Sequence, residues 1–150
     1  MPSEVVTYFH TLLITGIIGV ALVAAFQVNS SGIKSSFEDE ELTEILEAIA
    51  AEGTELVSLA RSTGSTSTLV MRLPISIGEM NWWARLVTSS EGSWVEGGFG
   101  SEMITSVVRV WLPRDVSASG DFRGGFGIPE LNCLVTADQV VLILTSVGGS

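Results

Sequence analysis

The chain has 150 residues, which fits one compact domain with an appendage and does not fit two full domains. It carries 17 acidic and 7 basic residues, a formal net charge of −10, and its basic residues are scattered from Lys34 to Arg123. We therefore expect no surface for nucleic acid or for an anionic membrane. The only cysteine, Cys133, excludes an intramolecular disulfide bond, and its apolar neighbours predict a buried thiol.

The chain begins with a long uncharged segment, in which no Asp, Glu, Lys or Arg lies between Glu4 and Lys34. Residues 5–26 would span about 33 Å as a helix, close to the roughly 30 Å of a bilayer core. A cleaved secretory signal has a basic start and a shorter apolar centre, and residues 1–5 contain no basic residue. Two interpretations remain, a membrane anchor and a helix covered by other copies of itself.

Small residues recur along this segment and would let neighbouring helices approach closely. The predicted helix-packing residues are Gly16, Gly19, Ala21, Leu22, Ala24 and Ala25. Thr7, Thr11 and Thr15 recur every four residues, so each hydroxyl could bond the carbonyl four residues before it. His10 is the only histidine, and the segment offers no companions for a metal or catalytic site.

Residues 27–41, "QVNSSGIKSSFEDEE", change the composition to serine, glycine and acid, which predicts a hinge or helix break. An amphipathic helix should follow, because apolar residues then recur at steps of three and four. Those predicted to pack on a sheet are Leu42, Ile45, Leu46, Ile49, Leu56 and Val57. The acidic run at 38–41 suits a helix start and lacks the spacing of a calcium loop.

From residue 66 onward the apolar period is two, which is typical of half-buried strands. The predicted strands cover residues 67–74, 80–89, 93–99, 106–113 and 139–147. Residues 140–144 are apolar throughout, so this strand should be covered on both faces or by another chain. The predicted fold class is α+β: an apolar helix in residues 1–30, a hinge and amphipathic helix in 31–64, and an antiparallel β-sandwich-like domain in 65–150.

Two further features of the β region bear on function. Trp82 and Trp83 are adjacent and must face opposite sides of a strand, so we expect one of them to be exposed or covered by a neighbouring subunit, as a possible subunit interface. The stretches 96–102 and 123–130 are rich in glycine but lack the phosphate-loop pattern. They are predicted to be turns, with Phe99 and Phe126 as apolar plugs.

The sequence contains no recognisable catalytic arrangement. It has no G-x-S-x-G and no H-E-x-x-H motif, and the only histidine lies in the apolar segment. No pair of carboxylates is marked by its spacing as acid and base. We therefore expect no enzymatic activity, no cofactor and no metal site.

The order of an uncharged helix, an amphipathic helix and a β domain resembles the archaeal type IV pilin and archaellin superfamily. The start "MPSEVVTYFHTLLI" is similar to the archaellum accessory proteins F and G, which keep an uncleaved N-terminal anchor. The resemblance implies a cell-surface filament subunit that polymerises with copies of itself through the apolar helix. Its alternative is a membrane-anchored, stator-like accessory protein whose β domain binds the cell envelope, an S-layer or related pilin-like subunits.

Overall fold

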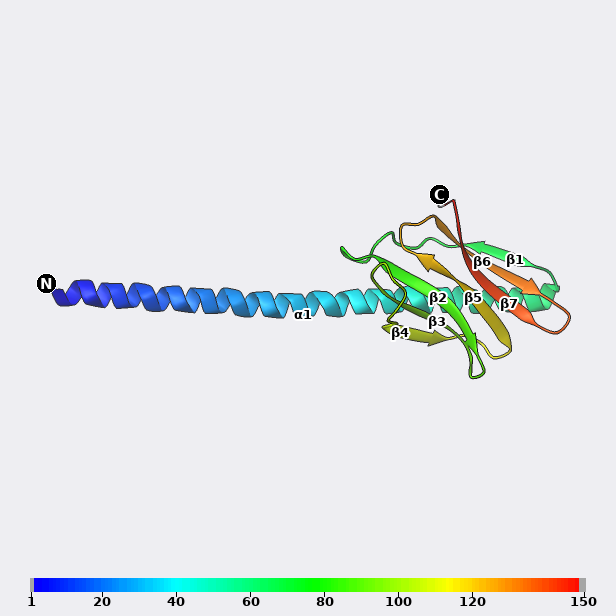
Figure 1. The fold of residues 1–150 in the computed structure, drawn as a ribbon, viewed down its shortest axis with the longest axis horizontal. Coiled ribbons are helices and arrows are strands. Elements are labelled where there is room, and N and C mark those ends of the chain that lie inside the picture. The colour runs from blue at the N-terminus through cyan, green and yellow to red at the C-terminus, as the bar shows by residue number, and fades with distance from the viewer. Residues whose placement is uncertain (1, 149–150) are drawn as a thin grey trace. The chain divides into compact units, whose positions relative to one another are not determined.

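The chain forms one long helix followed by a β sheet, and is of the α+β class (Figure 1). The computed structural model describes residues 2–148. Helix α1 covers Pro2–Thr63. The strands are β1 (Ser67–Val70), β2 (Trp82–Ser89), β3 (Gly92–Phe99), β4 (Val108–Trp111), β5 (Val116–Arg123), β6 (Ile128–Val135) and β7 (Val140–Val147).

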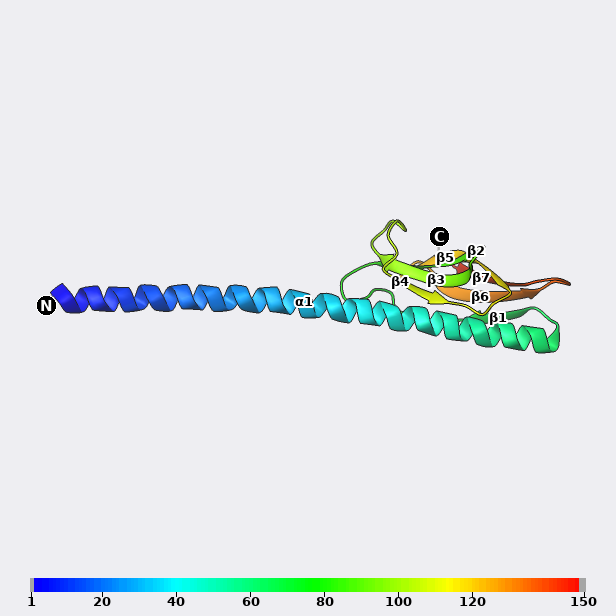
Figure 2. The same cartoon turned by 90° about the horizontal axis from the view of Figure 1, so that it is seen from below.

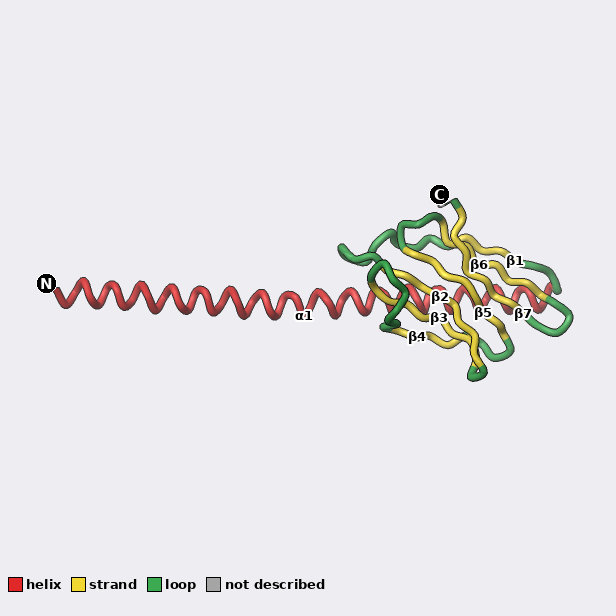
Figure 3. The backbone as a smooth tube through the Cα atoms, in the orientation of Figure 1, coloured by secondary structure: helices red, strands yellow, loops and turns green. Residues whose placement is uncertain are grey.

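All seven strands belong to one sheet in the order β1-β6-β7-β5-β2-β3-β4 (Figure 3). Every pairing is antiparallel except that between β5 and β7, which is parallel. Strand β5 pairs with β7 as far as Gly120 and with β2 from Asp121 onward. Gly120 has a φ of 104°, and a Cβ there would lie 2.1 Å from the carbonyl oxygen of Leu144. Glycine at this position therefore lets β5 join the two halves of the sheet.

Residues 38–63 of α1 lie along one face of the sheet (Figure 2). The residues predicted to pack there are buried in one hydrophobic core with β-strand residues such as Val95, Leu131 and Leu142: Leu42, Ile45, Leu46, Ile49, Leu56 and Val57. Gly53 allows the close approach, because a Cβ at Gly53 would lie 2.8 Å from Cδ2 of Leu142. Steps of three and four put these residues on one helix face, and the sheet removes that face from water.

The predicted break within residues 27–41 is absent, because α1 runs without interruption from Pro2 to Thr63. This stretch contains no proline, and its only glycine, Gly32, costs a helix about 1 kcal/mol relative to alanine, too little to end it. The chain nevertheless divides into two compact units, residues 1–37 and residues 38–150. The second half of α1 therefore belongs with the sheet.

Two strands, β5 and β6, were not predicted. β5 alternates small and polar residues, Val116-Ser-Ala-Ser-Gly120, so its pattern of hydrophobicity is weak. β6 contains Pro129, which normally argues against an inner strand. Here Pro129 is its second residue, and pairing with β1 begins only at Glu130.

The described residues form one helix layer on one sheet, and the second sheet of a sandwich is not among them. In β7, Leu142 and Leu144 are buried in the core, whereas Val141 and Ile143 on the opposite face are half-buried. The same alternation of apolar and polar residues serves a sheet covered by a helix and a sheet covered by a second sheet. For that reason the pattern could not distinguish the two architectures.

Candidate functional site

The first half of α1 exposes its entire apolar surface. Every residue from 5 to 30 is exposed, and the large apolar side chains range from 50% exposed at Leu13 to 76% at Phe26. By length and composition α1 can cross a membrane, since an 18-residue window near its N-terminus has a mean hydropathy of 2.2. Membrane anchors and signal sequences share these properties. An apolar surface of this extent marks a site of interaction with lipid or protein.

Small residues hollow one side of this helix into two shallow grooves. Gly16, Val20 and Ala24 line both, Gly19 lines the first and Ala21 the second. A Cβ built at Gly16 or Gly19 would meet no atom within 4 Å. The remaining two predicted packing residues, Leu22 and Ala25, are exposed but line neither groove. The glycine face is therefore open to a neighbouring helix.

The side chains of Thr11, Thr15 and His10 are hydrogen-bonded within the helix. The Thr11 hydroxyl donates to the Thr7 carbonyl at 2.9 Å, and the Thr15 hydroxyl donates to the Thr11 carbonyl at 2.8 Å, as predicted. Nδ1 of His10 lies 2.9 Å from the Val6 carbonyl oxygen, to which it donates as the Nδ1–H tautomer. These bonds remove the need for an external partner, so the threonine stripe and His10 are compatible with an apolar environment.

The prediction that Trp82 or Trp83 would be exposed is wrong, because each is only 1% exposed. Trp82 faces the core, where its ring lies 5.7 Å from that of Phe122 and its Nε1–H donates to the Pro74 carbonyl at 3.0 Å. Trp83 faces the opposite side, and its strand partner there is Gly98. The two indoles are thus buried on different faces of the same strand.

Two glycines of β3 let side chains pack closely on its two faces, Gly98 under the Trp83 indole and Gly97 under α1. A Cβ at Gly98 would lie 2.9 Å from Cζ2 of Trp83 and 2.5 Å from the Thr105 carbonyl oxygen. Because Gly98 has no side chain, the indole and the 100–107 connection can pack directly on its backbone. A Cβ at Gly97 would lie 2.9 Å from Cδ2 of Leu46 on α1. Both glycines lie inside β3 rather than in the predicted turn. Phe126, predicted as a plug, is 63% exposed.

A compact group of aromatic and charged residues occupies the face of β2, β3 and β4 that is turned away from α1. We call Arg85, Trp94, Glu96, Arg109 and Trp111 the arginine–tryptophan patch. Glu96 accepts hydrogen bonds from Nε of Arg85 at 3.1 Å and from Nε1 of Trp94 at 2.9 Å. Arg109 lies 3.8 Å from Glu96 and stacks over Trp94, with Cζ 4.2 Å from the ring centroid. Trp94 meets Trp111 edge to face at 5.2 Å.

Electrostatics within the patch favours the ionised form of Glu96. Its side chain is 7% exposed, and this burial by itself raises the pKa. The hydrogen bonds from Trp94 and Arg85 and the charges of Arg85 and Arg109 outweigh burial and lower the pKa below its usual value. Arg85 and Arg109 remain 40% and 47% exposed, so the patch presents two oriented guanidinium groups to solvent beside Trp111, which is 54% exposed.

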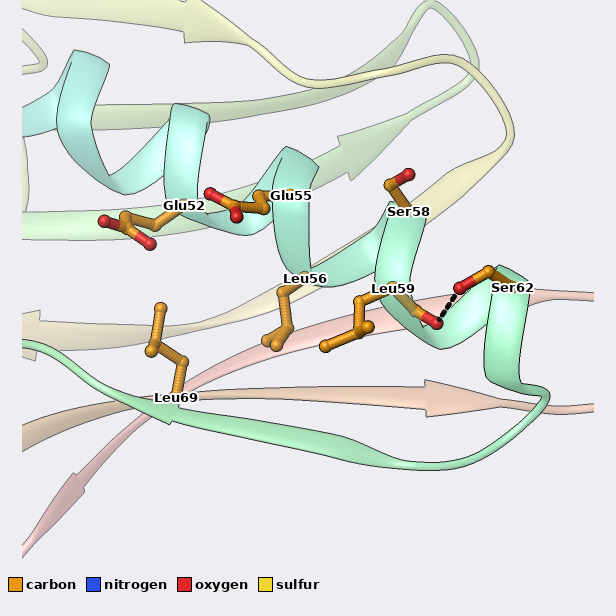
Figure 4. Close-up of a pocket in the computed structure, with 7 residues that line it drawn as sticks. All are labelled: Glu52, Glu55, Leu56, Ser58, Leu59, Ser62 and Leu69. Carbon is orange, nitrogen blue, oxygen red and sulfur yellow. Dashed lines mark hydrogen bonds between the residues drawn. The ribbon is translucent and has the colours of Figure 1, made fainter.

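A cleft of about 400 Å³ lies between the end of α1 and strand β1 (Figure 4). Its apolar side is formed by Leu56, Leu59 and Leu69, and its polar lining is Glu52, Glu55, Ser58 and Ser62. The Ser62 hydroxyl donates to the Leu59 carbonyl at 2.8 Å. No histidine, cysteine or lysine is among the residues that line the cleft.

The Cys133 thiol and possible metal ligands are the remaining groups with reactive potential. Cys133 is fully buried, and burial raises the pKa of its thiol, with the charge of Arg61 acting weakly in the other direction. Within residues 2–148, no group of three or more His, Cys, Asp or Glu side chains could hold a metal ion. Comparison of the chain with protein-family models, with curated proteins and with solved structures found no match.

Proposed function

We propose that this protein is a structural subunit of a cell-surface filament of the archaeal type IV pilus or archaellum kind, polymerising through the first half of α1. One observation carries the proposal. Residues 5–30 are all exposed and most of them are apolar, whereas the apolar stripe in the second half of the same helix is buried on the chain's own sheet. Water is a poor solvent for such a surface, and copies of the same helix can cover it.

The open glycine face supports helix-to-helix contact. A Cβ added at Gly16 or Gly19 would meet no atom of another part of the described chain within 4 Å, so packing within the subunit does not require glycine there. Glycine in a helix is unfavourable by about 1 kcal/mol relative to alanine. Close packing against the backbone of another helix would offset that loss, as it does in membrane helix pairs.

The experiment is electron microscopy of the purified full chain after removal of detergent, with Gly16→Leu/Gly19→Leu as the test variant. We expect long polymers from the wild type and none from the variant, because two leucines would fill the grooves. Gly32→Leu is the matched control, since Gly32 is also open in the same helix but outside the grooves. Normal polymers from the double variant, or dispersed subunits from the wild type, would contradict the proposal.

A second function, a membrane-anchored accessory protein whose β domain binds the cell envelope, is favoured by one property of α1. Its apolar half meets the length and hydropathy of a membrane span. Wild-type chains that stay dispersed in lipid vesicles and bind isolated cell envelopes would support this alternative. Vesicles that bind no envelope material would remove it.

A further inference from the structure

The exposed side of α1 in the second compact unit carries a row of carboxylates with no counter-charge. Residues 38–63 contain eight acidic residues and one basic residue, Arg61. Glu40, Glu44 and Glu47 are exposed and follow steps of four and three, so they share one helix face, which we call the acidic ridge. Within the part of the chain that the structure describes, none of the three forms an ion pair.

The arginine–tryptophan patch carries a local charge of the opposite sign. Its two arginines, Arg85 and Arg109, exceed its one carboxylate, Glu96, by one positive charge in a chain of net charge −10. Strand register places Arg123, Asp121 and Glu130 elsewhere on this face, so the positive charge is confined to the patch. Glu96 and Trp94 hold the two patch arginines in place before any partner arrives, so binding would cost little side-chain entropy. Arginine and tryptophan together are the residues most enriched at the centres of protein interfaces.

The spacing of the two surfaces also matches. Arg85, Glu96 and Arg109 lie opposite one another on three consecutive strands. Two strand spacings separate the backbones of Arg85 and Arg109 by roughly 9.5 Å. Seven residues of helix separate Glu40 from Glu47 by roughly 10.5 Å. A helix laid across β2, β3 and β4 could therefore offer one carboxylate to each guanidinium group, with Trp111 beside it.

The two surfaces cannot meet within one compact unit. Residues 38–63 of α1 cover one face of the sheet, the acidic ridge points away from that face, and the patch lies on the other (Figure 2). We propose that the arginine–tryptophan patch of one copy binds the acidic ridge of a second copy. Because the two contact surfaces differ, a pair of copies joined by one contact leaves one surface of each kind free, and further copies can add to both ends.

This inference rests on the proposed function, because the contact would form between neighbouring subunits of the filament. It predicts which surfaces of those subunits touch. The contact would also cover the half-exposed outer face of the sheet with a helix from the neighbouring subunit. The test uses the full chain carrying Glu44→Cys and Arg109→Cys, treated with a short bismaleimide cross-linker. Cys133 is kept, since it is fully buried. The control pair is Glu44→Cys with Arg72→Cys, because Arg72 is exposed and lies just beyond β1, at the far edge of the sheet.

We expect a ladder of covalent dimers, trimers and higher oligomers from the first pair and none from the control pair. A ladder, rather than dimers alone, is the signature of two different contact surfaces. In a second measurement, Glu40→Gln/Glu44→Gln/Glu47→Gln should raise the critical concentration for assembly about fivefold, which is what two exposed ion pairs are worth. The control variant Glu52→Gln/Glu55→Gln/Glu91→Gln removes the same number of charges outside the acidic ridge. It should leave the critical concentration unchanged.

The outcomes separate the contact from the filament. In one outcome, the wild type forms polymers while the Glu44→Cys/Arg109→Cys variant gives no cross-linked ladder. That result would overturn the contact and leave the proposed function standing. A ladder in concentrated detergent solution without any polymers would support the contact and count against the filament. An equal rise in critical concentration for both glutamine variants would also overturn the contact, because net charge alone would then explain it.

Discussion

The two halves of α1 share a helical backbone and many apolar residues, but they differ in how far those residues are exposed to water. Leu42, Leu46 and Ile49 in the second half are fully buried against the chain's own sheet. Leu22 and Phe26 in the first half are 65% and 76% exposed. The second half has an apolar stripe and an acidic side, whereas the first half is apolar all round. A stripe can be covered by one neighbour, but a fully apolar helix needs lipid or several other helices.

The largest expected contrast comes from shortening one leucine in each half. Leu46→Ala should lower the free energy of unfolding of residues 38–150 by about 2–5 kcal/mol, because it leaves a cavity beside Gly97. Leu22→Ala should change it by less than about 0.5 kcal/mol. Denaturant unfolding of the full chain, followed by tryptophan fluorescence, measures both, since all four tryptophans lie in residues 82–111. Equal losses from the two variants would show that the halves are not energetically separate.

The next contrast concerns carboxylates that do and do not have partners. Glu96→Gln should cost about 1–3 kcal/mol, since it weakens the hydrogen bonds of Arg85 and Trp94 to a buried group. Glu44→Gln, on the exposed ridge, should cost less than about 0.5 kcal/mol. The same tryptophan-monitored unfolding at neutral pH compares them, and a Glu96→Gln variant as stable as the wild type would remove the patch as a stabilising element.

Glu96 also gives the fold a defined dependence on pH. Because its pKa is lower in the folded chain than the usual value of 4.5, its stabilisation is fully present above about pH 4.5. It is lost as the pH falls through the lower, folded pKa. Unfolding curves between pH 3 and 7 should therefore show less acid sensitivity in Glu96→Gln than in the wild type. An identical slope in both would assign the acid sensitivity to other carboxylates.

The smallest contrast compares two helical glycines. Gly53→Ala places a Cβ 2.8 Å from Leu142, so overpacking of about 1–3 kcal/mol opposes a helix-propensity gain of about 1 kcal/mol, and a net loss of roughly 0–2 kcal/mol follows. Gly16→Ala meets nothing within 4 Å and should only gain helix stability. Chemical denaturation measures the free energy of unfolding of Gly53→Ala. The thermal loss of far-ultraviolet circular dichroism measures the helix stability of Gly16→Ala. A stabilising Gly53→Ala would mean that Leu142 moves freely.

Part of this arrangement could be read from the residues alone. The apolar stripe from Leu42 to Val57 predicted both the second half of α1 and the face that it buries. Apolar residues recur with a period of 3.6 when one side of a helix is buried and the other faces water. Strands β1, β2, β3, β4 and β7 were recognised in the same way from alternation. β5 was missed because small and polar residues such as Ser117 and Gly120 can form an inner strand only when neighbouring strands supply the pairing.

The sequence by itself determined the uncharged length of residues 5–33, the one-sided pattern of residues 42–60 and the acidic excess of the chain, since these depend only on residue type and spacing. Tertiary structure decided the burial of Trp83 over Gly98 and the meeting of Arg85, Glu96 and Arg109. Each of these depends on which strand lies beside which. Pairings between residues far apart in the chain leave no periodic trace in either strand, so only the folded sheet brings them together.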